Sequence, residues 1–237
     1  MKSLIGTINP GPLCKSEQIK PTVILILSAL LPTIHRYFGS IEFMRQASPS
    51  MSDFDTAFYM FGTAFLLMGI LPLAIIHFVF REPLKTYGLQ LGDWRKGLPV
   101  AAILFILIAG FMLYPSSQTG EMSEFYPFDK SAGDSVFAFV RFEALRGVLF
   151  YTAWEFFFRG FMLFGLRRYL GDWMAICIQT IPSCLWHIGT PTGEIFASIL
   201  GGILFGVFAI RTRSILWAFL LHWLIGIGMD LFIVMRF

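Results

Sequence analysis

Long runs of apolar residues, broken by short polar stretches, dominate the pattern along this chain. Each run is long enough, or nearly so, to cross about 30 Å of hydrocarbon as a helix. Lipid offers no partner for a free backbone N–H or C=O, and the runs do not alternate in polarity as barrel strands do, so helices are expected. The seven runs lie at 22–38, 55–80, 98–114, 136–166, 173–188, 194–210 and 214–235.

The fourth run is too long for one simple crossing. Its first part, 136–146, carries Arg141, Glu143 and Arg146, and we expect it to lie at the membrane interface before the helix enters the bilayer. The pattern therefore predicts an all-α polytopic transmembrane bundle of about seven membrane helices plus an interfacial segment. We expect a cytoplasmic N-terminal tail at 1–20, which has no signal-peptide core, and a single transmembrane domain at 21–237.

Composition agrees with this prediction, because 56% of the residues are hydrophobic and only 14% are charged, against about 25% in soluble domains. The lipid bilayer is therefore the main partner, and the net charge of +3 gives no reason to expect nucleic acid. No cysteine spacing fits a metal site or a disulfide framework, so Cys14, Cys177 and Cys184 are predicted to be free thiols.

Basic residues indicate the orientation of a multi-pass protein in the cell membrane. With seven crossings, one side is clearly richer in Lys and Arg, and we expect it to be cytoplasmic, with the N-terminus inside and the C-terminus outside. That side holds Lys2, Lys15, Lys20, Arg81, Lys85, Arg95, Lys96, Arg167, Arg168, Arg211 and Arg213.

Several ionisable residues fall within the apolar runs, where Arg, Lys or Asp costs about 2.5–3.5 kcal/mol on insertion scales. Such groups need partners or a function. Glu155 and Arg159 are four residues apart, which places them on one helix face as an internal ion pair, as the brace of a polar site, or as both. The residues concerned are His77, Glu155, Arg159, His187, Glu194, His222 and Asp230.

His187 and His222 lie on different predicted helices. A lone buried histidine is usually only a satisfied hydrogen-bonding group, whereas two of them near a carboxylate are typical of a metal or water-activating site. His77 has no comparable neighbours and is interpreted as structural or interfacial. Glu194 can be explained as a first-turn carboxylate, and Asp230 either pairs with Arg236 or faces the same cavity.

Three short segments resemble the motifs of the CAAX prenyl endopeptidase and bacteriocin-processing (CPBP, or Abi) family of intramembrane proteases. Residues 154–159 resemble Glu-Glu-x-x-x-Arg, residues 183–187 resemble Phe-x-x-x-His, and residues 222–226 resemble His-x-x-x-Asn or Asp. The resemblance covers about 147–235, with the motifs in family order on successive helices.

This resemblance implies a catalytic site of Glu155, His187 and His222. Arg159, Glu194 and Asp230 would support it, and His187 and His222 could hold a metal, with zinc as the candidate. Three positions depart from the family pattern: Trp154 replaces the first, catalytic Glu, Ser183 replaces Phe, and Gly226 replaces Asn or Asp. Trp cannot accept a proton from water, so the base would be Glu155, Glu194 or Asp230, unless catalysis is lost.

Three functions are therefore open. The first is an intramembrane endopeptidase that hydrolyses a peptide bond of a membrane-associated substrate, with a lipid-modified one as a candidate, through a Glu/His-activated water. The second is a non-catalytic binding, immunity or scaffold protein of the same fold. The third is a small transporter using Glu155, Arg159 and Asp230, although the chain shows no inverted repeat.

Overall fold

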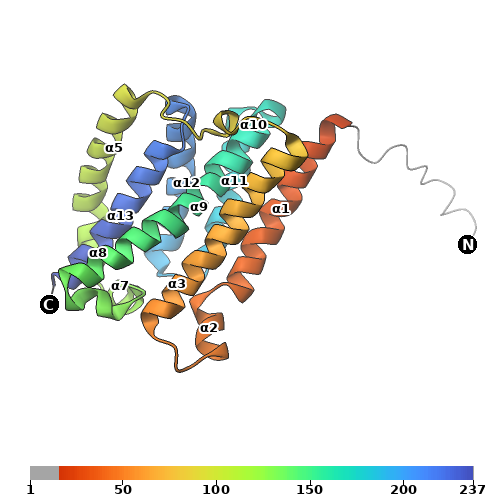
Figure 1. Ribbon diagram of the computed structural model, residues 1–237. Coiled ribbons are helices and arrows are strands. Elements are labelled where there is room, and N and C mark those ends of the chain that lie inside the picture. The colour runs from red at the N-terminus through yellow and green to blue at the C-terminus, as the bar shows by residue number, and fades with distance from the viewer. Residues whose placement is uncertain (1–15, 237) are drawn as a thin grey trace, which may run out of the picture.

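The computed structural model describes residues 16–236, which form helices joined by short turns, with no β-strand among them (Figure 1). Several long helices run unbroken through π-helical stretches. The N-terminal half contains α1 (Ser16–Phe38), α2 (Ile41–Ala47), α3 (Asp53–Ala64), η1 (Phe65–Ile70), α4 (Leu71–Ala74), η2 (Ile75–Phe80), η3 (Leu84–Tyr87), α5 (Trp94–Ile108), η4 (Ala109–Leu113), α6 (Tyr114–Ser117) and α7 (Gly120–Phe125). The C-terminal half contains η5 (Lys130–Asp134), α8 (Val136–Leu145), η6 (Arg146–Tyr151), α9 (Thr152–Glu155), η7 (Phe156–Phe164), α10 (Gly165–Leu170), α11 (Asp172–Trp186), α12 (Thr192–Thr212) and α13 (Leu216–Val234).

The predicted all-α membrane bundle is confirmed, but the number of crossings is not. Within the described residues, five helical segments are long and apolar enough to span a bilayer: Glu17–Ala47, Asp53–Phe80, Trp94–Ser117, Thr192–Thr212 and Leu216–Val234. The remaining two predicted runs also form long helices. However, the helix from α8 to α10 carries several charged residues, and α11 has only 15 residues. The predicted tail lies mostly outside the described residues, and Cys14 with it.

The segment predicted to be interfacial is not a separate element, because α8 continues without a break into the long helix that ends with α10. Glu143 and Arg146 are each only 3% exposed and lie in the protein interior. Arg141 is exposed, with its guanidinium 3.9 Å from the centre of the Phe54 ring.

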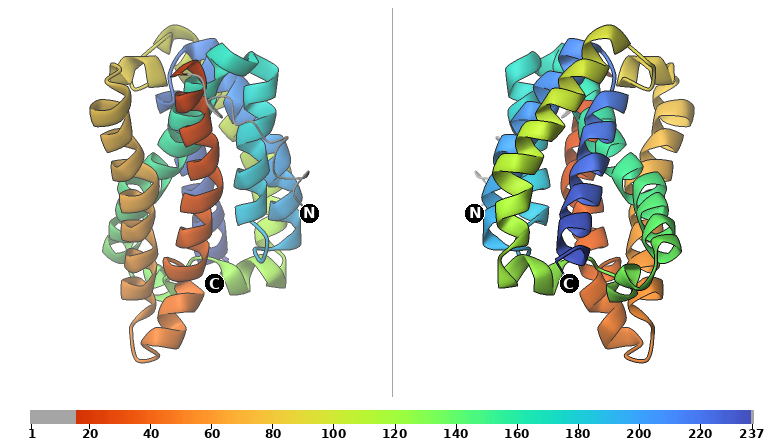
Figure 2. Two further views of the ribbon diagram at one scale, coloured as in Figure 1. Left: turned by 90° about the vertical axis from the view of Figure 1, so that its right-hand side faces the viewer. Right: turned by 90° about the vertical axis from the view of Figure 1, so that its left-hand side faces the viewer.

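The long helix from α8 to α10 lies at the centre of the bundle. It runs obliquely between the helix that starts with α3 and helix α13 (Figures 1 and 2). Every residue from 153 to 163 is buried, including Trp154, Phe157, Phe158 and Phe161. Protein surrounds this stretch on all sides, so the helix carries Glu155 and Arg159 inside the fold.

Helices α11 and α12 pack closely against each other at Gly202 and Gly206. A Cβ atom at Gly202 would lie 2.7 Å from the Thr180 side chain, so only glycine fits there. The Gln179 amide donates a hydrogen bond to the Gly202 carbonyl at 2.8 Å. This hairpin places the turn 187–191 at the same end of the molecule as α2 and α7 (Figure 2). Two hydrogen bonds hold the turn at this end. Arg36 donates one to the Ile188 carbonyl, and Glu121 accepts one from the Thr192 N–H.

Candidate active site

Glu155 is completely buried at the end of α9 and is paired on both sides. Its Oε1 lies 2.7 Å from Nδ1 of His222. Its Oε2 lies 3.3 Å from Nε of Arg159, which confirms the ion pair predicted from the four-residue spacing. A buried carboxylate is stable only with such partners, and Glu155 has no oxygen directed into open space.

His222 on α13 is oriented by this bond. A carboxylate can only accept hydrogen bonds. Nδ1 of His222 therefore carries the ring proton and donates a hydrogen bond to Glu155. The opposite nitrogen, Nε2, is then the reactive atom of the ring. The side chain is 19% exposed, and the Tyr151 ring lies 4.7 Å away between centroids.

His187 follows the last residue of α11 and has a parallel arrangement. Its Nδ1 lies 2.7 Å from the carbonyl oxygen of Ser183, which can only accept, so Nδ1 is again the protonated nitrogen. Its Nε2 lies 3.8 Å from Oε1 of Glu194 at the start of α12. Both histidines therefore have Nδ1 fixed by a neighbour and Nε2 available.

One small cavity of about 140 Å³ joins these groups. It is lined by His187 and His222, as the sequence predicted, and by Glu194. Glu155 is not among its lining residues, because it lies behind the His222 ring. The other polar lining residues come from the cavity mouth and from the long central helix: Arg36, Glu42, Arg45, Glu124, Tyr126, Lys130, Arg146, Tyr151 and Thr190.

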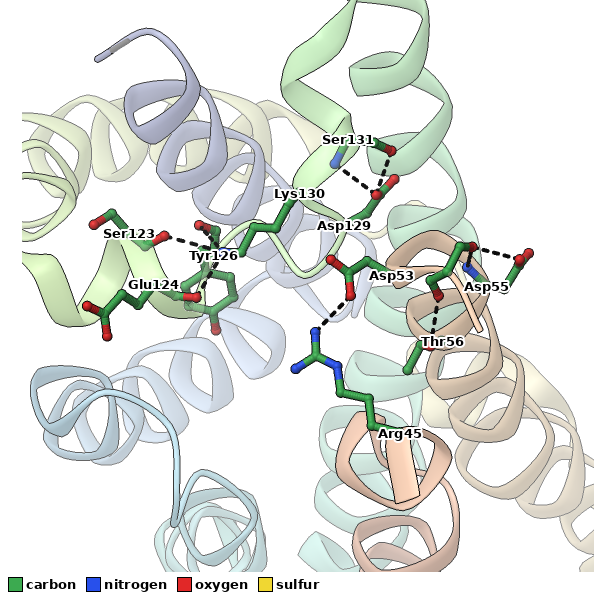
Figure 3. A network of polar contacts seen from close by, with 11 residues as sticks. Arg45, Asp53, Asp55, Thr56, Ser123, Glu124, Tyr126, Asp129, Lys130 and Ser131 are labelled. Carbon is green, nitrogen blue, oxygen red and sulfur yellow. Dashed lines mark hydrogen bonds and ion pairs between the residues drawn. The ribbon is translucent and has the colours of Figure 1, made fainter. Parts of the chain in front are cut away.

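Glu194 is held by Tyr126, whose hydroxyl donates to its two carboxylate oxygens at 2.8 and 2.9 Å. Burial, followed by the nearby Glu194 charge, raises the pKa of Tyr126 well above its ordinary value, so the hydroxyl stays protonated as a donor. Nothing in the sequence around Tyr126 signalled this contact. Lys130 stabilises the loop that carries Tyr126. Its ammonium donates hydrogen bonds to the carbonyls of Ser123, Glu124 and Tyr126 (Figure 3).

Trp154 occupies the position of the family's first glutamate and is a core residue, 1% exposed. Its ring centroid lies 5.4 Å from His187 and 6.4 Å from His222, so the indole borders the cavity between the two histidines. It also packs edge-on against Trp186 at 4.9 Å. No acid group is available at this position.

Gly226 occupies the position of the family's Asn or Asp, and the space of that side chain is taken. A Cβ atom on Gly226 would overlap the hydroxyl of Tyr151. Tyr151 also lines the cavity, with the Arg146 guanidinium 5.1 Å from its ring centre. Arg146 is a charged residue inside an apolar run, and this feature of the sequence could have indicated that the neighbouring Tyr151 lines a polar cavity.

Asp230 does not reach the cavity, and its predicted pairing with Arg236 is wrong. Its Oδ2 accepts a hydrogen bond from Nη1 of Arg146 at 2.8 Å, while Glu143 lies 3.5 Å from the same nitrogen. Arg236 instead donates to the Ser117 carbonyl. His77 is exposed, with its ring edge-on to Phe78, and it is not among the residues that line this cavity.

The histidine geometry only partly fits a metal. Ligating histidines commonly donate their second N–H to a carboxylate or a carbonyl, as His222 and His187 do here. A catalytic zinc also needs three protein ligands about 2.0–2.2 Å away. Within the described residues, no group of three or more His, Cys, Asp or Glu gathers closely enough to hold an ion. Cys177 and Cys184 are free thiols, as predicted.

A second, larger hollow of about 840 Å³ adjoins the cavity. It lies between α1 and α11 and shares Arg36, Glu42 and Trp186 with the cavity. Its wall is mostly apolar, with Pro32 on α1 and Leu185 on α11 among its members. The histidines are therefore bordered by an apolar groove on the side of the bundle.

Comparison with known proteins relates part of the chain to a family of membrane proteases. Residues 135–227 match the family model described as Type II CAAX prenyl endopeptidase Rce1-like. No curated protein and no solved structure matches the chain. The matched segment contains Glu155, His187, Glu194 and His222. The resemblance to the CAAX prenyl endopeptidases is therefore confirmed over residues 135–227.

Proposed function

We propose that this multi-pass membrane protein is an endopeptidase that cuts a peptide bond of a membrane-associated protein, as the CAAX prenyl endopeptidases do. The observation that carries the proposal is the shared cavity lined by His187 and His222, each of which has Nδ1 engaged elsewhere and Nε2 free of a hydrogen bond to Nδ1's partner. The family match supports a hydrolase of this class.

Glu155 and His222 form a unit suited to proton transfer. A buried carboxylate that accepts the Nδ1 proton fixes the tautomer of the imidazole and stabilises the imidazolium that forms when Nε2 takes a proton. Arg159 pairs with Glu155 from the other side, with its Nε 3.3 Å from Oε2. Glu155 thus acts through His222 as a positioning residue, and water is activated within the cavity.

The substrate would approach from the lipid side. The apolar groove between α1 and α11 has room for a lipid chain or an extended peptide, and it adjoins the cavity at Trp186. This arrangement supports a membrane-tethered, lipid-modified peptide as substrate. Zinc at His187 and His222 remains a prediction from the sequence, and no step of the proposed reaction passes through a metal.

Isotope labelling tests the proposal. The full-length protein in phosphatidylcholine–phosphatidylglycerol vesicles would be incubated with a farnesylated peptide ending in a CAAX sequence, in water enriched in ¹⁸O. Hydrolysis at a peptide bond places one ¹⁸O in the new C-terminal carboxylate of the product, which mass spectrometry detects. Intact peptide that co-purifies with the protein would instead support the non-catalytic binding function, which the replacements at Trp154 and Gly226 favour.

A further inference from the structure

A peptidase site of this kind needs a carboxylate that activates water, and two of the three candidates from the sequence do not fit that role. Glu155 is 0% exposed, and its oxygens are committed to His222 and Arg159. Asp230 is also 0% exposed and is bound to Arg146. Neither residue lines the cavity, so neither can hold a water molecule that attacks a bound peptide.

Glu194 is placed differently. Its side chain is 24% exposed, lines the cavity and directs Oε1 toward Nε2 of His187 at 3.8 Å. This separation is too long for a direct hydrogen bond, and both atoms are acceptors, because Nδ1 of His187 carries the ring proton. One water molecule donating a hydrogen bond of about 2.8 Å to each acceptor spans such a gap.

The other carboxylates of the cavity lack this relation to a histidine. Glu42 pairs with Arg36 at 3.4 Å, and Glu124 is exposed at the mouth. Glu194 is also the best fixed of the three, because Tyr126 binds both of its oxygens and the Thr192 N–H anchors the start of α12 to Glu121.

We propose that Glu194 is the general base of this site, with His187 as the second acceptor of the attacking water. The base has thus moved from the central helix, where Trp154 stands, to the first turn of α12. Glu194 takes one proton from water, and the water oxygen bonds to the carbonyl carbon of the scissile peptide. When the C–N bond breaks, Glu194 returns the proton to the leaving amine. This inference rests on the proposed peptidase function.

Substitution of Glu194 tests the proposal on the full-length protein in vesicles with the farnesylated CAAX peptide. Glu194→Gln keeps the size and polarity of the side chain but removes the base, so kcat should fall about 10²- to 10⁴-fold while KM changes little. Glu194→Asp keeps the charge and should retain more activity than the Gln variant. Glu17→Gln is the matched control, because Glu17 is an exposed carboxylate in the first turn of α1.

The outcomes separate this inference from the proposed function. Loss of kcat in Glu194→Gln, with an unchanged melting temperature and partial recovery in Glu194→Asp, supports Glu194 as the base. If Glu194→Gln keeps the wild-type rate while His222→Ala loses it, the proposed base is wrong and the peptidase function stands. If the wild type and every variant share one background rate, the peptidase function fails and this inference fails with it.

Discussion

Single substitutions at two motif positions have changed the chemistry of the cavity wall. The indole of Trp154 lies edge-on to both His187 and His222 and packs on Trp186. Gly226 leaves room for the Tyr151 hydroxyl. Each departure is matched by neighbours that fill the space, so the cavity wall is closely packed at both positions.

Restoring the family residue at position 154 should therefore be harmful. Trp154→Glu removes a large aromatic ring from the core, which costs about 3–5 kcal/mol, and places an unpaired carboxylate beside the buried Glu155. We expect a lower melting temperature in detergent and lower activity in vesicles. Trp154→Phe, which keeps an aromatic ring, is the control and should lose less. A Glu variant that is as stable as the wild type and more active would show that this position is merely degenerate.

At the scale of elements, the site depends on the α11–α12 hairpin, because His187 ends one helix and Glu194 starts the other. The two helices approach closely at Gly202, next to Thr180. The neighbouring Gly201 faces open space, with no atom within 4 Å of a Cβ built on it. The hairpin geometry, and with it the His187–Glu194 spacing, depends on one of these glycines and not on the other.

This contrast gives a matched pair of variants. In Gly202→Ala the new methyl group meets Thr180, so overpacking should destabilise the protein by about 1–3 kcal/mol and reduce activity by shifting Glu194 relative to His187. Gly201→Ala should leave both properties near wild type. Thermal unfolding in detergent and peptide cleavage measure the two effects. Equal behaviour of the two variants would contradict the role given to this contact.

The long apolar runs predicted the helices well, because the 3.6-residue helix is the only regular structure that satisfies the backbone of such segments in lipid. Spacing within one helix also predicted the Glu155–Arg159 pair. Contacts between helices followed less well from the sequence. The Arg146–Asp230 pair joins residues 84 positions apart, and Tyr126 reaches Glu194 from an irregular loop. Such contacts depend on helix rotation and loop path, which no local pattern encodes.

At the scale of the whole molecule, the cavity lies near the end where the turn after α11, α2 and α7 meet (Figure 2). The predicted orientation, with a cytoplasmic N-terminus, would place this end on the outer side of the membrane. That orientation remains a prediction. The apolar groove between α1 and α11 adjoins the cavity at Trp186, which is the arrangement on which the proposed membrane-tethered substrate depends.

The proposed peptidase function depends on the two cavity histidines, His187 and His222. The most direct test is the rate of cleavage of the farnesylated CAAX peptide in vesicles by the wild type and by His222→Ala, with His77→Ala as the control. His77 is exposed and is not among the residues that line the cavity. Because the proposed function gives His222 a role in proton transfer, we predict a loss of about 10²- to 10⁴-fold in kcat/KM for His222→Ala and a wild-type rate for His77→Ala. Equal rates for all three proteins would contradict the account.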